Sequence, residues 1–351
     1  MIYMQKLKFI AVGNFGSIMI SSNIEELSKY NHLIIDTSSH DLEKSFISSK
    51  IQIGNELTNG LGTHGDPLLG EQAVWKIKAD LEKFVADADL VFIIGGLGGG
   101  TATGAIPTIA QIVKNTGALT LSMVTYPFSF EGIQREKIAI AGIENLIKKS
   151  DSTFVIKNDF LILESDKKID MKDFFSQLGK SFYQKVEIIL NILKLPKLMS
   201  IDFSKFEAIL KNGELCLVTS GKAFGANRAK QALENAFSSP YYYGNISNAH
   251  KMFINISSNG DLERDEVRNI GNLARSYSNN KIHELELGIT QNDNLISEIE
   301  ITIIGTNVNS QSNYSLIHSK KNNNTEEREV IQKKSKEKNN TEITIPKWLK
   351  G

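Results

Sequence analysis

The sequence has little that would cross-link it, anchor it in a membrane or give it a charge of one sign. It contains one cysteine, so no disulfide framework can form, and the apolar context ELCLV predicts that Cys216 is a buried, inert thiol. Lysine plus arginine and aspartate plus glutamate both number 40, which argues against a protein built to coat nucleic acid. No apolar run reaches about 18 residues, and MIYMQKLKFIAVG lacks the apolar core of a signal peptide. We therefore expect a cytoplasmic protein without a nucleic-acid partner or direct membrane insertion.

Short apolar runs alternate with helical patterns in the first half of the chain. Strands are expected at 7–13, 32–38, 88–96, 119–127 and 152–159, and helices at 24–30, 70–87, 105–115 and 136–150. Strands that alternate with helices predict βαβ units and a parallel sheet covered on both faces. Ligands of such sheets bind at the carboxyl ends of the strands.

The second half predicts a long central helix followed by a smaller α/β unit. Residues 170–195 read as one helix that is apolar on more than one side, which is typical of burial between two bodies. Strands are expected at 214–220, 250–257, 283–290 and 297–306, in a mixed sheet. The predicted organisation is a Rossmann-like α/β nucleotide-binding domain (1–165), the central helix with the start of the next loop (166–200), an α/β domain (201–308), a disordered polar linker (309–341) and a terminal recognition peptide (342–351).

The stretch GGLGGGTATG, residues 95–104, lies between an expected strand and an expected helix. Its glycines leave backbone N–H groups open to a ligand, and the helix beyond it favours an anion. The candidate phosphate-binding residues are Gly98, Gly99, Gly100, Thr101, Ala102, Thr103 and Gly104. It is not a P-loop, because no GxxxxGK[ST] occurs. A GxGxxG at 60–65 suggests a dinucleotide oxidoreductase as an alternative, but that motif belongs after the first strand, where the sequence is GNFGSI.

Together these motifs resemble those of the tubulin superfamily, and of FtsZ, the cell-division GTPase, in particular. GGLGGGTATG is similar to the superfamily's GGGTGTG, and VTYPFSFEGIQR (124–135) to TxPFxFEGxxR. The stretches at 51–73, 154–159 and 236–272 resemble further FtsZ segments in the same order. The resemblance covers about residues 7–308. It implies the tubulin/FtsZ fold, GTP or GDP with a possible Mg²⁺, and head-to-tail protofilaments in which each subunit completes its neighbour's site.

The resemblance also assigns residues to the nucleotide site. Gly13 and Gly16 would belong to the first phosphate loop, and Gly62 and Thr63 to the loop that senses the terminal phosphate. Glu131 and Arg135 would contact ribose and guanine, although a plain i, i+4 ion pair is the alternative reading. Asn158 would contact the nucleoside, and Phe174 or Phe175 would stack on the base. All of these residues stand in matching segments of the chain.

Several positions depart from the family pattern. The first glycine loop is GNFGSIM (13–19), with side chains where the family has glycines. Lys180 and Ser181 stand where the family places an asparagine and an aspartate that read guanine, and a lysine cannot accept N–H bonds. In the catalytic loop Asp202 keeps one carboxylate, but Ser200 replaces an asparagine and Lys205 replaces the second carboxylate. We expect weak or absent hydrolysis, with Lys205 acting like an arginine finger as the alternative.

The end of the chain, ITIPKWLK, resembles the C-terminal peptide of FtsZ. Ile345, Pro346, Trp348 and Leu349 would bind a membrane-tethering adaptor of the FtsA or SepF type, whereas a frayed tail is the plain alternative. Two functions remain open at this point. One is an FtsZ-like GTP-binding polymer, recruited to the division site, with weak hydrolysis. The other is a non-hydrolysing scaffold that assembles alone or with a second FtsZ.

Overall fold

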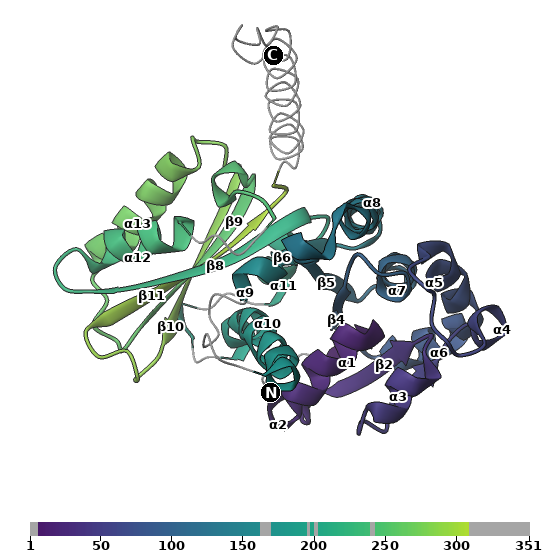
Figure 1. The fold of residues 1–351 in the computed structure, drawn as a ribbon. Coiled ribbons are helices and arrows are strands. Elements are labelled where there is room, and N and C mark those ends of the chain that lie inside the picture. Colours follow the sequence, from purple (N-terminus) through teal and green to yellow (C-terminus); the bar gives the residue numbers. More distant parts are fainter. Residues whose placement is uncertain (1–5, 162–169, 195–196, 200–202, 239–242, 309–351) are drawn as a thin grey trace, which may run out of the picture. The chain divides into compact units, whose positions relative to one another are not determined.

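In the computed structural model, residues 6–161, 170–194, 197–199, 203–238 and 243–308 are described. Eleven strands form one sheet in the order β3-β2-β1-β4-β5-β6-β8-β11-β9-β10-β7 (Figure 1). They are β1 (Leu7–Val12), β2 (Asn31–Asp36), β3 (Lys50–Gln52), β4 (Leu90–Gly96), β5 (Leu119–Tyr126), β6 (Ser152–Lys157), β7 (Lys197–Met199), β8 (Glu214–Phe224), β9 (Lys251–Ser258), β10 (Glu284–Gln291) and β11 (Glu298–Thr306). Strands β3 to β6 pair in parallel, and antiparallel pairs occur only beyond β8 among the described strands. The α/β fold expected from the sequence is confirmed.

Helices cover both faces of the parallel half. The helices are α1 (Gly13–Ser22), α2 (Ile24–Leu27), α3 (Ser39–Lys44), α4 (Asn55–Thr58), α5 (Pro67–Val74), α6 (Lys78–Val85), α7 (Thr101–Asn115), α8 (Ile133–Lys149), α9 (Asn158–Leu161), α10 (Met171–Lys194), α11 (Phe203–Leu210), α12 (Arg228–Phe237) and α13 (Arg264–Tyr277). Alternate residues of β1 enter different cores: Phe9 packs with α1 and α10, and Ile10 packs with α5, α7 and α8. Both faces of the parallel half of the sheet are therefore shielded from water, which is why the sequences of its central strands are continuous apolar runs.

The central helix is α10, and it packs beside α1 (Figure 1). Phe182, which is fully buried, meets Phe15 of α1 edge-on at a centroid distance of 5.3 Å. Leu178, Val186 and Ile189 are buried in the same core. No helix in the described part of the chain is long and apolar enough to cross a bilayer.

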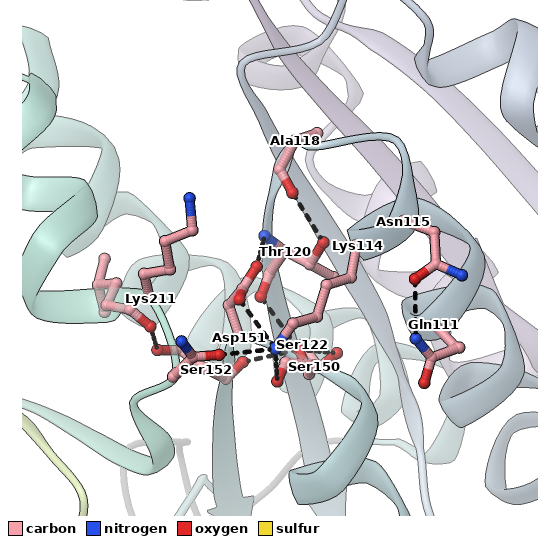
Figure 2. Close-up of polar contacts among 12 residues, drawn as sticks. Gln111, Lys114, Asn115, Ala118, Thr120, Ser122, Ser150, Asp151, Ser152 and Lys211 are labelled. Carbon is pink, nitrogen blue, oxygen red and sulfur yellow. Dashed lines mark hydrogen bonds and ion pairs between the residues drawn. The ribbon is translucent and has the colours of Figure 1, made fainter.

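The parallel half meets the C-terminal strands through β6 and β8, which pair over Ser152–Phe154 and Glu214–Cys216. A polar cluster lies where β5 and β6 begin, and Figure 2 shows Asp151 between Lys114 of α7 and Thr120 of β5. Asp151 accepts from the Thr120 backbone N–H at 3.0 Å and pairs with the Lys114 ammonium at 3.0 Å. Cys216 is fully buried there, as expected, and burial raises the pKa of its thiol to about 12.

Three local features differ from the sequence prediction. GNFGSIM forms the first turns of α1 rather than a loop, and an added Cβ on Gly16 would lie 2.9 Å from the carbonyl oxygen of Ile94. Gly16 is therefore required for the close approach of α1 to the sheet. The helix expected at 70–87 is divided into α5, a short 3-10 helix η1 (Trp75–Ile77) and α6. Strands β3 and β7, at the two edges of the sheet, were not expected.

Candidate functional site

A pocket of about 670 Å³ opens at the carboxyl ends of four neighbouring parallel strands. The strand ends contribute Val12 (β1), Gly96 (β4), Thr125 (β5) and Asn158, which directly follows β6. Helices α1 and α10 and the segment from Phe128 to Arg135 complete the wall. This is the edge at which the fold class places ligands.

One end of the pocket is formed by backbone. Gly99, Gly100, Thr101 and Ala102 line it where β4 passes into α7. Gly100 is the N-cap of α7 and no side chain caps this first turn. Open N–H groups and the positive end of the helix dipole make this end of the pocket suitable for an anion.

The other predicted phosphate residues lie behind this surface. Gly98 adopts φ +101° and its N–H donates to Thr103 Oγ1 at 3.0 Å, so both residues shape the turn. An added Cβ on Gly104 would lie 2.8 Å from the backbone nitrogen of Glu71, because α5 packs tightly on α7. Gly13 lines the pocket with φ +74°, whereas Gly16 packs against the sheet. The glycine stretch therefore combines ligand-facing positions with packing positions.

The predicted terminal-phosphate loop lies against the glycine turn. A Cβ on Gly100 would lie 2.6 Å from the backbone nitrogen of Asp66, and the Thr63 and Thr101 hydroxyls are 3.4 Å apart. Thr37 meets the Thr101 hydroxyl at 2.7 Å. Gly62 has φ +83° and, like Thr63, does not line the pocket itself. The three hydroxyls thus converge at the start of α7.

Asp36 is buried at the end of β2, beside these hydroxyl groups. Its carboxylate accepts from the backbone N–H groups of Thr37 at 2.7 Å and Ser38 at 3.1 Å. Burial outweighs these two bonds and raises the pKa of Asp36 to about 6. This pKa shift was not predictable from the sequence, because it depends on how the end of β2 is covered.

Glu131 and Arg135 face the pocket as an ion pair of 2.6 Å between Oε2 and Nη1. Glu131 Oε1 also accepts from the Phe128 backbone N–H at 2.9 Å. Asn158 is 7% exposed, and its Oδ1 is buried with no hydrogen-bond partner among the described residues. An unpaired buried acceptor that lines a pocket suits a ligand hydroxyl or N–H group.

The opposite end of the pocket is aromatic. Phe128 stacks on Phe130 at 4.9 Å, and Phe174 lies 6.0 Å from Phe128 and 5.4 Å from Phe175. Phe175, a predicted stacking residue, is 42% exposed and lines the pocket. Phe130 was missed, although it stands in the FEGIQR stretch; Phe15 was noted only as a departure from glycine. Lys180 is exposed and does not line the pocket.

The sequence of this chain is similar to those of known proteins. The sequence matches the Tubulin/FtsZ family, GTPase domain, over residues 6–166, and the FtsZ family, C-terminal domain, over residues 215–309. It is 34% identical over 322 residues to the cell division protein FtsZ of Buchnera aphidicola subsp. Baizongia pistaciae, covering 91% of this chain and 82% of that protein. The chain belongs to the FtsZ family. The cell division protein FtsZ of Wigglesworthia glossinidia brevipalpis is 32% identical over 304 residues, covering 86% and 79% of the two chains.

Solved structures agree with this assignment. An empty FtsZ dimer from M. jannaschii matches with a TM-score of 0.73 and 30% identity, covering 88% of this chain and 90% of that one. CetZ2 from Haloferax volcanii, a GTPγS-bound protofilament, matches with a TM-score of 0.73 over 87% and 94% of the chains. At 17% identity the second likeness concerns the fold alone. The FtsZ and tubulin membership expected from the motifs is confirmed.

The pocket of this FtsZ-family chain suits GTP or GDP, the nucleotides of its family. The backbone N–H groups at Gly99–Ala102 suit the phosphates, and the aromatic end suits stacking on a base. Asn158 Oδ1 can accept a hydrogen bond from the ligand. Among the described residues, no three His, Cys, Asp or Glu side chains gather as a metal site.

The predicted catalytic residues of the FtsZ loop are described only in part. Ser200 and Asp202 lie outside the described residues, as do Ile345, Pro346, Trp348 and Leu349. Lys205 lies on α11 with its ammonium 3.2 Å from Glu286 Oε2 of β10. The lysine that stands at position 205, where the family has a carboxylate, is therefore paired with Glu286 of the same chain.

Proposed function

We propose that this chain binds GTP in the pocket and polymerises head to tail into protofilaments for cell division or a related cytoskeletal role. The observation that carries the proposal is the polarity of the pocket. It has a backbone anion cradle at Gly99–Ala102 and an aromatic end at Phe174 and Phe175, so a nucleotide fits in one orientation. We infer that Mg²⁺ enters with the phosphates, since it binds mainly phosphate and water oxygens.

We infer that hydrolysis is weak. The FtsZ resemblance implies that carboxylates of one subunit activate water at the nucleotide of the next. An ionised ammonium cannot accept a proton from that water, and Lys205 occupies one of the two carboxylate positions. Glu286, 29% exposed, neutralises Lys205 in part but stands on a different element.

A non-hydrolysing scaffold is the second candidate, and the Lys205–Glu286 ion pair favours it. Such a subunit would assemble alone or with a second FtsZ. In either case we propose that residues 342–351 bind a membrane-tethering adaptor like FtsA or SepF, which would bring a cytoplasmic polymer to the division site.

The test is phosphate release from GTP against protein concentration. Lys205→Asp alone would place a carboxylate beside Glu286, where the two negative charges repel. The informative variant is therefore the exchange Lys205→Asp with Glu286→Lys, and the matched control exchanges Lys211 and Glu207, which pair at 3.1 Å near the same helix.

We expect little release from the wild type and a gain from the Lys205–Glu286 exchange that rises with concentration. Fast wild-type turnover that rises with concentration would overturn the inference of weak hydrolysis. If no variant releases phosphate while sedimentation and electron microscopy show filaments, the scaffold candidate replaces the GTPase. Absence of both binding and filaments would refute both.

A further inference from the structure

The two helices that line the pocket offer it one polar side chain, Asn14 of α1, which follows Gly13, and a Cβ on Gly13 would lie 3.6 Å from Ala102 Cβ at the phosphate end. Apart from Gly13 and Asn14, the lining residues from α1 and α10 are Phe15, Ile18, Phe174, Phe175 and Leu178. Aromatic rings hold a base by its face, which every base has, and alkyl groups form no hydrogen bonds with its edge. These residues therefore bind a planar ring without distinguishing one purine from another.

The next positions along α10 do not supply a reading group either. An added Cβ on Gly179 would lie 3.2 Å from Ser22 Oγ, so this position faces α1. The Gly179 carbonyl accepts from Asn23 Nδ2 at 3.2 Å, which fixes the contact. Lys180 is exposed and outside the pocket lining.

The polar groups on the remaining wall do not select guanine. Both Glu131 oxygens already accept hydrogen bonds, from Arg135 and from the Phe128 backbone. An arginine that donated to N7 and O6 together would select guanine. Arg135 stands instead beside the glycine turn, where an added Cβ on Gly98 would lie 3.4 Å from Arg135 Cβ, and its Nη1 pairs with Glu131. The unpaired Asn158 Oδ1 accepts equally from a ribose hydroxyl, from the guanine amino group or from the adenine amino group.

We propose that this pocket takes purine nucleotides through their phosphates and by stacking, without reading the edge of the base. Guanine, hypoxanthine and adenine nucleotides then bind with similar affinity. The inference rests on the proposed function, because it concerns the base specificity of the same nucleotide site. Phe15 and Ile18 on α1, with Phe174, Phe175 and Leu178 on α10, would contact the base without forming hydrogen bonds to it.

A site that hydrogen-bonds to the edge of the base and a site that only stacks on its face should differ in how strongly they discriminate between nucleotides. A site built to hydrogen-bond one substrate rejects an analogue that lacks the group by about 10⁴- to 10⁵-fold, because its own polar groups are left unpaired. An apolar site discriminates much less, by about a hundredfold at most. We expect dissociation constants of GDP, IDP and ADP to lie within about tenfold of one another.

The experiment is calorimetric titration of the full chain, stripped of nucleotide, with GDP, IDP and ADP at one salt concentration. Binding of all three within tenfold supports the inference. Preference for GDP over ADP by more than a hundredfold overturns it and leaves the proposed function standing. Absence of binding by all three overturns both.

A substitution at Phe175 tests whether the base binds at the aromatic end of the pocket. Phe175→Ala should weaken GDP and ADP by the same factor, about 5- to 150-fold, as expected for loss of one stacking surface. Phe175 is 42% exposed, so the fold should tolerate the change, and Phe224→Ala, at a 77% exposed position of β8, is the matched control. A loss confined to GDP would contradict base-independent stacking. A Phe175→Ala variant that binds both nucleotides like the wild type would overturn the assignment of the aromatic end.

Discussion

Gly99 is a position at which a substitution should weaken nucleotide binding without changing the stability of the fold. An added Cβ there meets nothing within 4 Å, and its φ lies outside the left-handed range, so alanine is accommodated without strain. The same methyl group would stand in the pocket that Gly99 lines. Gly99→Ala should therefore change the free energy of unfolding by no more than about 0.5 kcal/mol and yet weaken nucleotide binding.

The expected loss of affinity follows from the hydrogen bonds at stake. A methyl group keeps the phosphate from close approach to the backbone of residues 99–102, and one bond to a charged group contributes about 1.5–3 kcal/mol. That corresponds to about 10- to 150-fold in Kd. Titration of a fluorescent guanine nucleotide measures it, and urea unfolding checks stability. Gly271→Ala is the control, since its Cβ would meet only Leu287 Cδ1 at 3.6 Å. Unchanged affinity in Gly99→Ala would refute the placement of the phosphates.

Three further predictions concern stability. Gly104→Ala should cost at least about 3 kcal/mol in urea unfolding, because its Cβ would overlap the Pro67 carbonyl oxygen between α5 and α7; a smaller cost would mean that these helices separate easily. Asp36 has its folded-state pKa raised from 3.8 to about 6, so its stabilising effect is present below 3.8 and lost as pH rises through about 6. Asp36→Asn should therefore raise the free energy of unfolding by up to about 3 kcal/mol at pH 7 but hardly below pH 3.8, and a pH-independent gain would contradict this reasoning. Lys114→Met should destabilise by about 2–3 kcal/mol because it leaves the buried Asp151 carboxylate without its cation, and Asp151→Asn in the same chain should recover part of that loss.

Strands β1, β2, β4, β5 and β6 were predictable because burial on both faces gives each of them an apolar run. Strand β3 (KIQ) has no such run and was not expected. The break in the helix at 70–87 was not predictable. Its apolar positions keep a four-residue spacing straight through η1, at Ala73, Ile77, Leu81 and Val85. The periodicity therefore carries no sign of the 3-10 segment that divides α5 from α6. What constrains α5 is a tertiary contact: a Cβ on Gly70 would lie 2.7 Å from the Gly100 carbonyl oxygen.

The kind of ligand that the site suits was predictable from the sequence. Which of its residues face the ligand and which serve packing was less predictable. Glycine serves both for ligand approach and for tight packing, and the sequence alone does not distinguish Gly99 from Gly104. Phe15 is a different case, because the sequence already showed a side chain in place of a glycine. Only the structure shows that it packs edge-on against the buried Phe182 and also lines the pocket. The orientation of such a side chain is set by α10, more than 150 residues away in the chain.

The ladder between β6 and β8 has a mechanical consequence. It pairs three residues of each strand, whereas β4 and β5 pair over seven. Torque applied to the C-terminal strands reaches the nucleotide side through this narrow ladder and the neighbouring α10. Twisting of the strands from β3 to β6 against the C-terminal strands should therefore occur mainly at Ser152–Phe154.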